Sequence, residues 1–256
     1  MFEKVRVVLV EPSHPGNVGA VARAMKNMGF ERLYLVKPRR FPDEEATWRA
    51  ASAGDVLDSA VVVNSLFEAL SDCAFAVGTS ARERRIPWPI LDARRASAEM
   101  VTRASQSEVA LVFGREDRGL TNEELELCHL HVNIPTSDAY RSLNLAMAVQ
   151  ILCYELRMQV LFEDLPESSD SDWDAPFADV GGLSRFYEHL EQTLIDIAFL
   201  DPAAPRQLMK RLRRLYNRIQ IDEMELNILR GILTETQKVA HELGALKTRS
   251  TQGEAE

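Results

Sequence analysis

Residues 134–155 read IPTSDAYRSLNLAMAVQILCYE, and this stretch decides the fold. A short apolar strand end leads into a loop of small polar residues, and after Ser142 nearly every position is apolar. A helix that is apolar on all sides is buried, either in a core or against another subunit. Small polar groups therefore stand at the mouth of a buried helix, which predicts a ligand pocket at this junction.

The sequence before this stretch repeats one pattern, a short apolar strand followed by a helix. We expect strands, rich in β-branched residues, at 5–10, 33–36, 74–77, 109–113 and 132–134. Helices are expected at 17–28, after the capping pairs Ser65/Glu68 and Thr121/Glu124, and after Ser142. Short strands that alternate with helices predict an α/β domain with a mainly parallel sheet over residues 1–163.

A different composition begins after residue 163. Residues 164–182 are acidic, rich in serine and glycine and without apolar periodicity, so we expect an acidic flexible linker. Apolar residues then recur at helical spacing in 183–200, 206–219 and 222–246, which predicts a small all-α domain over 183–247. The polar residues 248–256 are expected to form a disordered tail.

Composition places the chain among ordinary soluble proteins, with 256 residues of which 46% are hydrophobic and 27% charged. Its three cysteines (Cys73, Cys128, Cys153) form no CxxC pair and are expected to be reduced thiols of a cytoplasmic protein. The N-terminal apolar run is too short for a signal peptide. The apolar stretch 143–156 is also too short to span a bilayer, so no membrane association is expected.

The net charge of −9 conceals local clusters of cations. Six of them lie between residues 206 and 218 with no acidic residue among them: Arg206, Lys210, Arg211, Arg213, Arg214 and Arg218. Such a helix face fits nucleic-acid phosphates, since arginine pairs suit phosphate geometry. The alternative is a solvated face that pairs with nearby carboxylates. Smaller basic clusters lie at 82–85 and at Arg23 with Lys26.

Three loops that follow apolar strands form the candidate ligand site, because ligands of open α/β sheets bind at the carboxyl ends of the strands. These loops are 78–81, 114–119 and 135–142. Their small residues leave backbone groups open to a polar ligand of about adenosine size, with Leu143 and Leu145 beside it. Taken alone, Gly114 and Gly119 also fit ordinary turn chemistry.

Several familiar sites are missing from the sequence. The segment EPSHPGNVG after the first strand is not GxGxxG, and neither a P-loop nor a GxSxG motif occurs. No metal site is predicted, because the five histidines lack metal-ligand spacing and His129 and His131 have no evident third ligand. His14 lies between prolines and serine in a loop, where a solvated role is favoured over a catalytic one.

Three segments resemble, in order, the three motifs of SPOUT-class RNA 2′-O-ribose methyltransferases. They are NVGAVARA (17–24), LVFGREDRGLTNEEL (111–125) and IPTSDAYRSLNLAMAVQILCYEL (134–156). Within this class, TSARERRIPWP (79–89) and LNILRGIL (226–233) resemble the bacterial TrmJ type. The resemblance implies methylation of the ribose 2′-oxygen of tRNA nucleotide 32, a cytidine or uridine of the anticodon loop, with S-adenosylmethionine as cofactor.

The resemblance also implies a structure that periodicity does not reveal. The C-terminal part of the sheet domain would form a trefoil knot, a rare exception among folds. Two subunits would pack through their knot regions as a homodimer, which would explain why the helix after Ser142 is apolar on all sides.

The resemblance further assigns the site residues. Cofactor contacts fall on Thr79, Ser80, Ala81, Gly114, Ile134, Arg141, Ser142 and Leu143, with Leu145 as a neighbour. Catalytic roles fall on Arg23, Arg115, Ser142 and Asn144. RNA contacts fall on Arg23, Arg84, Lys210, Arg211, Arg213 and Arg214. Since arginine stays protonated, we expect Arg23 to grip a phosphate or a developing oxyanion and not to act as a base.

Two other functions stay open at this level. The shared motifs also fit a ribose methyltransferase that acts on another RNA, such as ribosomal RNA. A non-catalytic RNA-binding knot protein is the alternative from another class, and the presence of Asn17, Arg23 and Ser142 argues against it.

Overall fold

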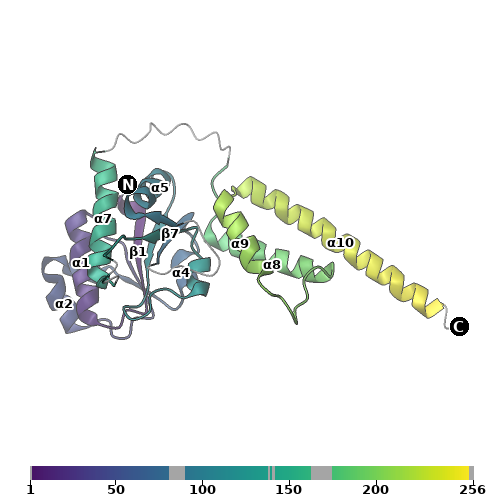
Figure 1. Ribbon diagram of the computed structural model, residues 1–256, viewed down its shortest axis with the longest axis horizontal. Helices are drawn as coiled ribbons and strands as arrows, with labels where there is room; N and C mark the ends of the chain where they lie inside the picture. The colour runs from purple at the N-terminus through teal and green to yellow at the C-terminus, as the bar shows by residue number, and fades with distance from the viewer. Residues whose placement is uncertain (1, 81–89, 138, 140–141, 163–174, 254–256) are drawn as a thin grey trace. The chain divides into compact units, whose positions relative to one another are not determined.

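The computed structural model describes residues 2–80, 90–137, 139, 142–162 and 175–253, with side chains through residue 243. The chain separates into two compact units, with the boundary between Asp172 and Trp173 (Figure 1). This boundary falls inside the segment expected to be a linker.

The first unit is built on a seven-stranded sheet with the order β3-β2-β1-β6-β4-β7-β5. The strands are β1 (Val5–Val10), β2 (Leu33–Val36), β3 (Val61–Val63), β4 (Phe75–Thr79), β5 (Ile90–Asp92), β6 (Val109–Phe113) and β7 (Leu130–Asn133). Every strand pair is parallel. The central strands β1 and β6 are buried along their whole length, as expected for strands covered on both faces. The parallel α/β prediction is confirmed.

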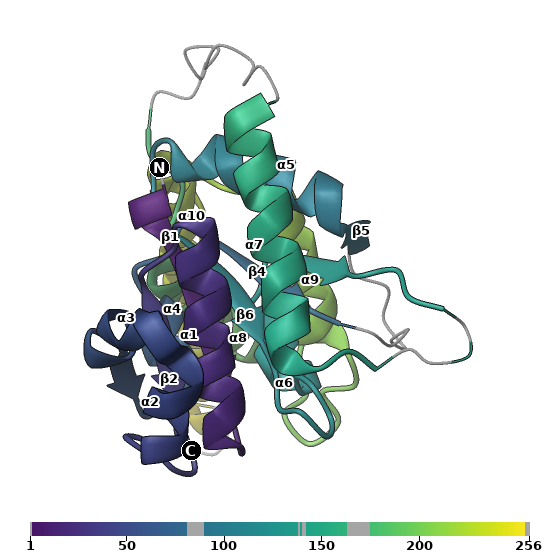
Figure 2. The same ribbon diagram turned by 90° about the vertical axis from the view of Figure 1, so that its left-hand side faces the viewer.

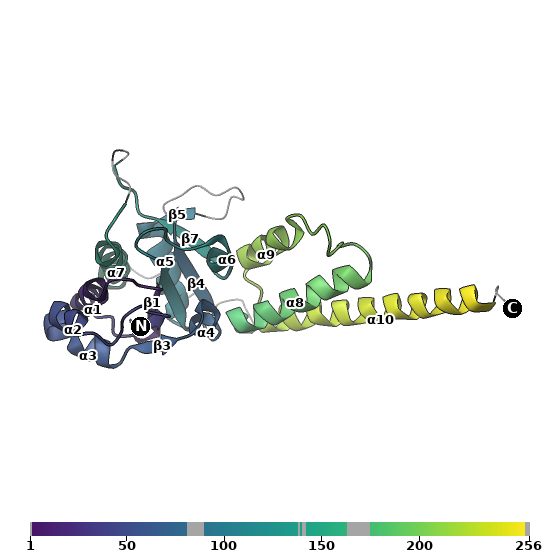
Figure 3. The same cartoon turned by 90° about the horizontal axis from the view of Figure 1, so that it is seen from below.

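Helices cover both faces of this sheet, as Figure 3 shows. They are α1 (Pro15–Met28), α2 (Glu44–Ala50), α3 (Gly54–Asp58), α4 (Leu66–Leu70), α5 (Ala93–Ala104), α6 (Asn122–Glu126) and α7 (Leu145–Phe162), with 3₁₀ turns η1 (Phe2–Lys4) and η2 (Ala51–Ala53). The capping box at Thr121 and Glu124 is present in full. At Ser65 only half of it forms, because the Glu68 carboxylate accepts from the Asn64 N–H instead.

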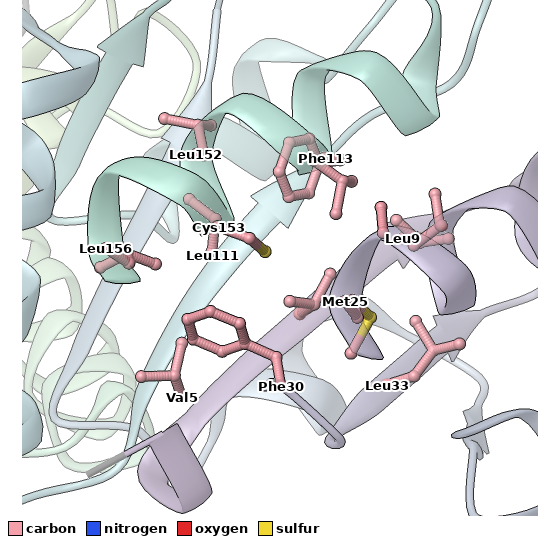
Figure 4. Packing of buried hydrophobic residues seen from close by; sticks show 14 of the residues in the cluster. Val5, Leu9, Met25, Phe30, Leu33, Leu111, Phe113, Leu152, Cys153 and Leu156 are labelled. Atoms are coloured by element: carbon pink, nitrogen blue, oxygen red, sulfur yellow. The ribbon is translucent and has the colours of Figure 1, made fainter. Parts of the chain in front are cut away.

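Helix α7 packs beside α1 and presses one face into the core (Figure 2). Leu152, Cys153 and Leu156 are fully buried there among residues of the sheet and of α1 (Figure 4). Each such aliphatic side chain contributes about 1.5–3 kcal/mol of burial free energy. The opposite face leaves Met147, Tyr154, Leu161 and Phe162 exposed.

The length of α7 bears on the membrane prediction. The helix has 18 residues and extends past the stretch 143–156, so by length and composition alone it could cross a bilayer. A core helix of a globular domain passes the same test. The buried face of α7 belongs to such a core.

The three cysteines are free and buried, as expected. Burial raises the pKa of the Cys73 thiol to about 12 and raises the pKa of the other two thiols as well. These thiols are therefore protonated and unreactive at neutral pH.

The second unit consists of three helices, α8 (Val180–Asp196), α9 (Leu208–Ile219) and α10 (Glu223–Gly253), which confirms the predicted all-α domain. Its core contains Phe186 and Tyr216, whose rings meet edge to face at 4.9 Å. The apolar periodicity of 206–219 would also place Leu215 and Ile219 inward, but in the structure they are 41% and 51% exposed.

Both ends of this unit differ from the expected boundaries. Helix α8 starts at Val180, inside the segment 164–182, because the Asp179 carboxylate caps it by accepting from the Gly182 N–H at 2.5 Å. Helix α10 continues to Gly253, past the expected end at residue 247. The helical backbone therefore takes in most of the segment expected to be a tail.

Candidate functional site

A cavity of about 650 Å³ opens at the carboxyl edge of the sheet, where β4, β6 and β7 end and α7 begins. Most of the predicted cofactor contacts line it: Thr79, Ser80, Gly114, Ile134, Ser142, Leu143 and Leu145. Ala81 and Arg141, the other two, lie outside the described residues. The three strand-end loops thus meet at one site, and its volume suits a ligand of nucleoside size.

The loop after β6 forms one wall of the cavity. A Cβ atom on Gly114 would lie 2.1 Å from the carbonyl carbon of Gly119 and 2.2 Å from the nitrogen of Leu120. Gly119 adopts φ +71°, and its N–H donates to the Arg115 carbonyl at 2.9 Å. Turn chemistry explains both glycines, and the turn they make is itself part of the site.

The end of β4 forms a second wall, which is tied to its neighbouring strands. The Thr79 hydroxyl donates to the Val112 carbonyl at 3.1 Å, and the Ser80 N–H donates to the Val132 carbonyl at 2.9 Å. The Asn133 amide donates to the Ser80 carbonyl at 2.9 Å. These contacts hold Thr79 and Ser80 against the neighbouring strands β6 and β7. Sequence reasoning missed Asn133.

Arg115 lines the cavity, but its guanidinium is held by two carboxylates. Nε donates to Glu11 at 2.8 Å, while Nη1 and Nη2 donate to the two oxygens of Glu124 at 2.9 and 3.0 Å. The hydrogen bond from Arg115 is the main cause of the lowered pKa of Glu11. With its donors engaged in this way, Arg115 is arranged to brace the loop and the cap of α6.

A hydrogen-bonded chain connects the three motif segments. Glu116 accepts from the Ser13 N–H and hydroxyl at 3.1 and 3.0 Å and from the Asn17 amide at 3.1 Å. Asn17 in turn accepts from the Asn144 amide at 3.1 Å. Asn144 also caps α7, since its Oδ1 accepts from the Ala146 N–H at 2.9 Å. Sequence reasoning missed Glu116, whose partners lie about a hundred residues away.

Arg23 stands apart from this cavity. It lines a smaller groove of about 490 Å³ between α1 and α7, together with Asn27, Met147 and Leu143. Leu143 lines both the groove and the cavity, so Arg23 lies just beyond the cavity wall. Its side chain is exposed and forms no hydrogen bond or ion pair with any described residue. Its donors are therefore open to a substrate.

Two of the histidines, His129 and His131, are buried and have structural surroundings. His129 is buried, its Nδ1 accepts from the Ala76 N–H at 3.1 Å, and burial lowers its pKa to about 4. His131 is also buried and contacts the Leu125 carbonyl at 3.1 Å. No group of three potential metal ligands occurs in the part of the chain that the structure describes.

The predicted RNA-contacting cations of the second unit lie on α9. Arg211 and Arg218 are exposed, and Lys210, Arg213 and Arg214 are half-buried. The Arg213 guanidinium lies 4.6 Å from the ring centre of Tyr187. Arg84, the predicted RNA contact in the first unit, lies outside the described residues.

Two family models match this chain. One describes the SpoU rRNA methylase family and matches residues 4–154, and the other describes the C-terminal domain of the tRNA methyltransferase TrmJ and matches residues 182–245. The parallel sheet and its strand-end cavity both lie within the residues that the first model matches. The chain therefore belongs to the class of the SpoU methylases. Within that class, the chain belongs to the TrmJ methyltransferase family.

Individual relatives agree over nearly the full length. The chain is 54% identical to tRNA (cytidine/uridine/adenosine-2′-O-)-methyltransferase TrmJ of Pseudomonas aeruginosa, over 95% of this chain and 97% of that protein. It is 50% identical to the cytidine/uridine enzyme of Pectobacterium atrosepticum, over 94% and 100%. The crystal structure of TrmJ from Z. mobilis superimposes with a TM-score of 0.76 at 30% identity, over 90% and 97%.

Enzymes of this family use S-adenosylmethionine, and the cavity fits that cofactor. Apolar side chains of Ile134, Leu143 and Leu145 offer a surface for a flat base, while the loops at Thr79 and Gly114 present backbone polar groups. Glu116 also lines the cavity, and its carboxylate is held in place by Ser13 and Asn17.

Glu116→Gln is expected to destabilise the protein in a pH-dependent way. Burial opposes ionisation of Glu116, but hydrogen bonds from Asn17 and Ser13 outweigh it, so its pKa lies below the ordinary 4.5. A carboxyl group whose pKa is lower in the folded than in the unfolded protein stabilises the fold at pH values above its unfolded-state pKa. This stabilisation is lost as the pH falls through its folded-state pKa. At pH 7 the free energy of unfolding of the variant should be about 1–2 kcal/mol lower than that of the natural protein.

Chemical denaturation between pH 3 and pH 7 would measure this effect. The difference between Glu116→Gln and the natural protein should shrink as the pH falls below about 4.5. Asp117→Asn is the control, because that neighbouring carboxylate is 77% exposed and makes only a long contact of 3.9 Å with Arg118. A difference that stayed constant down to pH 3 would contradict the assigned network.

Proposed function

We propose that this protein methylates the ribose 2′-oxygen of nucleotide 32 in the anticodon loop of tRNA. The main support is that one chain carries both the strand-end cavity and a helical domain that matches the TrmJ C-terminal model. The Pseudomonas and Pectobacterium relatives are named as enzymes that act on cytidine and uridine, and the Pseudomonas enzyme also on adenosine. Such an enzyme recognises the ribose hydroxyl, which every ribonucleotide carries, and need not read the base edge.

The position of each residue determines whether it would bind the cofactor or act on the substrate. Thr79, Ser80, Gly114, Ile134, Ser142, Leu143 and Leu145 would hold S-adenosylmethionine, together with the predicted contacts Ala81 and Arg141. When bound, the cofactor supplies an activated methyl group. Ser142 faces the same cavity at the start of α7, where Asn144 fixes the helix end. Arg23, with free donors beside Leu143, holds a phosphate or the developing charge on the ribose oxygen.

The active form is a homodimer that packs through the knot region. The exposed apolar residues of α7 (Met147, Tyr154, Leu161, Phe162) lie on the helix face that the core leaves uncovered. A stable interface has such an apolar centre, which explains why α7 is apolar on both faces.

The deciding experiment combines labelled S-adenosylmethionine with transcripts of the cognate tRNAs. Methyl transfer is expected at the 2′-oxygen of nucleotide 32, mapped by nuclease digestion and mass spectrometry. A tRNA that carries a 2′-deoxynucleotide only at position 32 is the matched control and should accept no methyl group. Transfer to the deoxy substrate, or to another nucleotide, would overturn the assignment.

Ribosomal RNA is the second candidate substrate, since the model that matches residues 4–154 is named for rRNA methylases. The same assay with ribosomal RNA tests it. Transfer to ribosomal RNA without transfer to tRNA would establish this alternative. The helical domain argues for tRNA because its matching model is named for a tRNA methyltransferase.

The basic face of α9 should make tRNA binding depend on salt. Arg211 is exposed on a helix without acidic residues, and each phosphate contact releases a counterion. Arg211→Ala should weaken binding and reduce the slope of log Kd against log salt by roughly one. Arg230→Ala, which removes an exposed cation from α10, is the control for net charge. Equal slopes for all three proteins would argue against this surface.

A further inference from the structure

A tryptophan stands out on the surface of the first unit. Trp48 on α2 is 76% exposed, although tryptophan normally buries most of its large ring. The guanidinium of Arg49 lies 5.4 Å from its ring centre. The two side chains form an exposed aromatic surface with a positive charge beside it.

Helix α2 is held firmly against α1, so this surface has a fixed position. A Cβ atom on Gly19 would lie 2.1 Å from the Ala46 carbonyl oxygen and 2.9 Å from the Cβ of Arg49. Gly19 is on the same side of α1 as the exposed Arg23 and Lys26 by helical spacing, but it is buried by this close approach. The same helix α1 carries Arg23 one turn further on. Trp48, Arg49 and Arg23 are therefore parts of one rigid arrangement.

A basic loop connects this surface to the cavity. Lys37, Arg39 and Arg40 follow β2 at the carboxyl edge of the sheet, and all three are exposed. The Arg39 N–H donates to the Pro12 carbonyl at 3.1 Å. Ser13, which follows Pro12, binds Glu116, a residue that lines the cavity. The loop is thus anchored to a segment that is itself hydrogen-bonded to the cavity wall through Glu116.

The charges around the loop leave two of its cations available. Arg40 pairs with Asp43 at 2.7 Å, whereas Lys37 and Arg39 form no ion pair with any described residue. Glu44 and Glu45 are exposed in the first turn of α2, and Glu45 faces Gly16 of α1. Lys37, which also acts electrostatically on Glu11, and Arg39 therefore lie without an ion pair among the described residues on the segment between β2 and α2, the helix that carries Trp48.

We propose that Lys37, Arg39, Arg40, Trp48 and Arg49 form a binding surface for unpaired nucleotides of the RNA substrate, which we call the α2 platform. This inference rests on the proposed function and extends it to nucleotides next to the target. An exposed aromatic ring stacks on an unpaired base, while lysine and arginine contact the flanking phosphates. A base inside a double helix is already stacked, so the platform selects single-stranded segments such as loops.

The first test separates substrate binding from chemistry. Trp48→Ala should raise KM for tRNA about ten-fold, with kcat and the Kd for S-adenosylmethionine unchanged. Trp48→Phe retains a stacking ring and should restore most of the loss. Phe67→Ala, which removes another exposed aromatic ring (40%) on α4, is the matched control and should leave KM unchanged.

A second test examines the cations of the platform. Lys37→Ala/Arg39→Ala should reduce the salt dependence of tRNA binding, with a slope of log Kd against log salt lower by about two. Arg94→Ala/Arg95→Ala removes the same charge from α5, where both arginines are more than two-thirds exposed at 72% and 77%. This control should retain the natural slope.

A third test needs no turnover. The chain has three tryptophans, so the double variant Trp88→Phe/Trp173→Phe retains only Trp48. Binding of tRNA should quench the fluorescence of Trp48 in this variant. An anticodon stem-loop should quench it as well, whereas a fully paired duplex of equal length should not. Quenching reports on the platform even if the natural protein methylates no tRNA. Absence of methylation would count only against the proposed function.

Two outcomes would overturn the platform. One is an unchanged KM in Trp48→Ala together with absent quenching, in a protein that methylates tRNA. The other is a change of oligomeric state in Trp48→Ala, measured by sedimentation, with tRNA binding unaffected. That second result would make Trp48 a contact between protein subunits.

Discussion

Arg23→Ala is expected to lower kcat by a factor of about 10²–10³, while the Kd for S-adenosylmethionine stays unchanged. The side chain lines the groove between α1 and α7 and does not line the cofactor cavity, so its removal leaves the cofactor contacts intact. Its donors are free of protein partners among the described residues, in contrast to those of Arg115. Single-turnover kinetics would measure the chemical step, and calorimetry would measure cofactor affinity.

Two further variants make this prediction specific. Arg23→Lys keeps the charge but loses the forked donor geometry, and should recover only part of kcat. Lys26→Ala removes a cation one turn along the same helix, where the ammonium group is already bound to Asp55 at 2.6 Å. It should leave kcat unchanged. Turnover of Arg23→Ala within a few-fold of the natural protein would refute the catalytic role of Arg23.

The location of the site could be predicted because it depends on local signals. Ligand sites of parallel sheets lie where strands end, and strand ends can be recognised from β-branched runs followed by small residues. Three such loops, at Thr79, Gly114 and Ser142, converge on one cavity. The edge strands β3 and β5 were not predicted, because each has only three residues and so shows no periodicity.

The connections between the motifs could not be predicted, because they join distant segments. Glu116 binds Ser13 across 103 residues, and Asn144 binds Asn17 across 127. Sequence patterns indicate the type of a residue but not its partners. Arg115 was expected to act in catalysis, yet its donors face Glu11 and Glu124.

Arg6 illustrates the same limit on a strand. It interrupts the apolar run of β1, where nothing in the sequence reveals that it is only 1% exposed. The structure pairs it with Asp72 through two hydrogen bonds of 2.8 and 2.9 Å. A buried guanidinium of this kind needs partners brought together by the tertiary fold.

Gly114→Ala is expected to weaken the binding of S-adenosylmethionine by roughly 30- to 150-fold, which corresponds to losing two or three hydrogen bonds of about 1 kcal/mol each. The added methyl group would lie 2.1 Å from the Gly119 carbonyl carbon, so the loop 114–119 must move outward. That loop is a wall of the cavity, and its displacement removes the backbone groups that face the ligand. Calorimetry measures this loss directly.

Gly54→Ala is the matched control for this substitution. Gly54 begins α3 with φ −59°, and a Cβ atom there would have no neighbour within 4 Å. Alanine in that conformation should stabilise the fold by about 0.4–1 kcal/mol and leave cofactor binding unchanged. Thermal unfolding of both variants separates a local change of the loop from a general loss of structure. If Gly114→Ala remained folded and bound the cofactor as tightly as the natural protein, the loop after β6 could not be the wall that holds it.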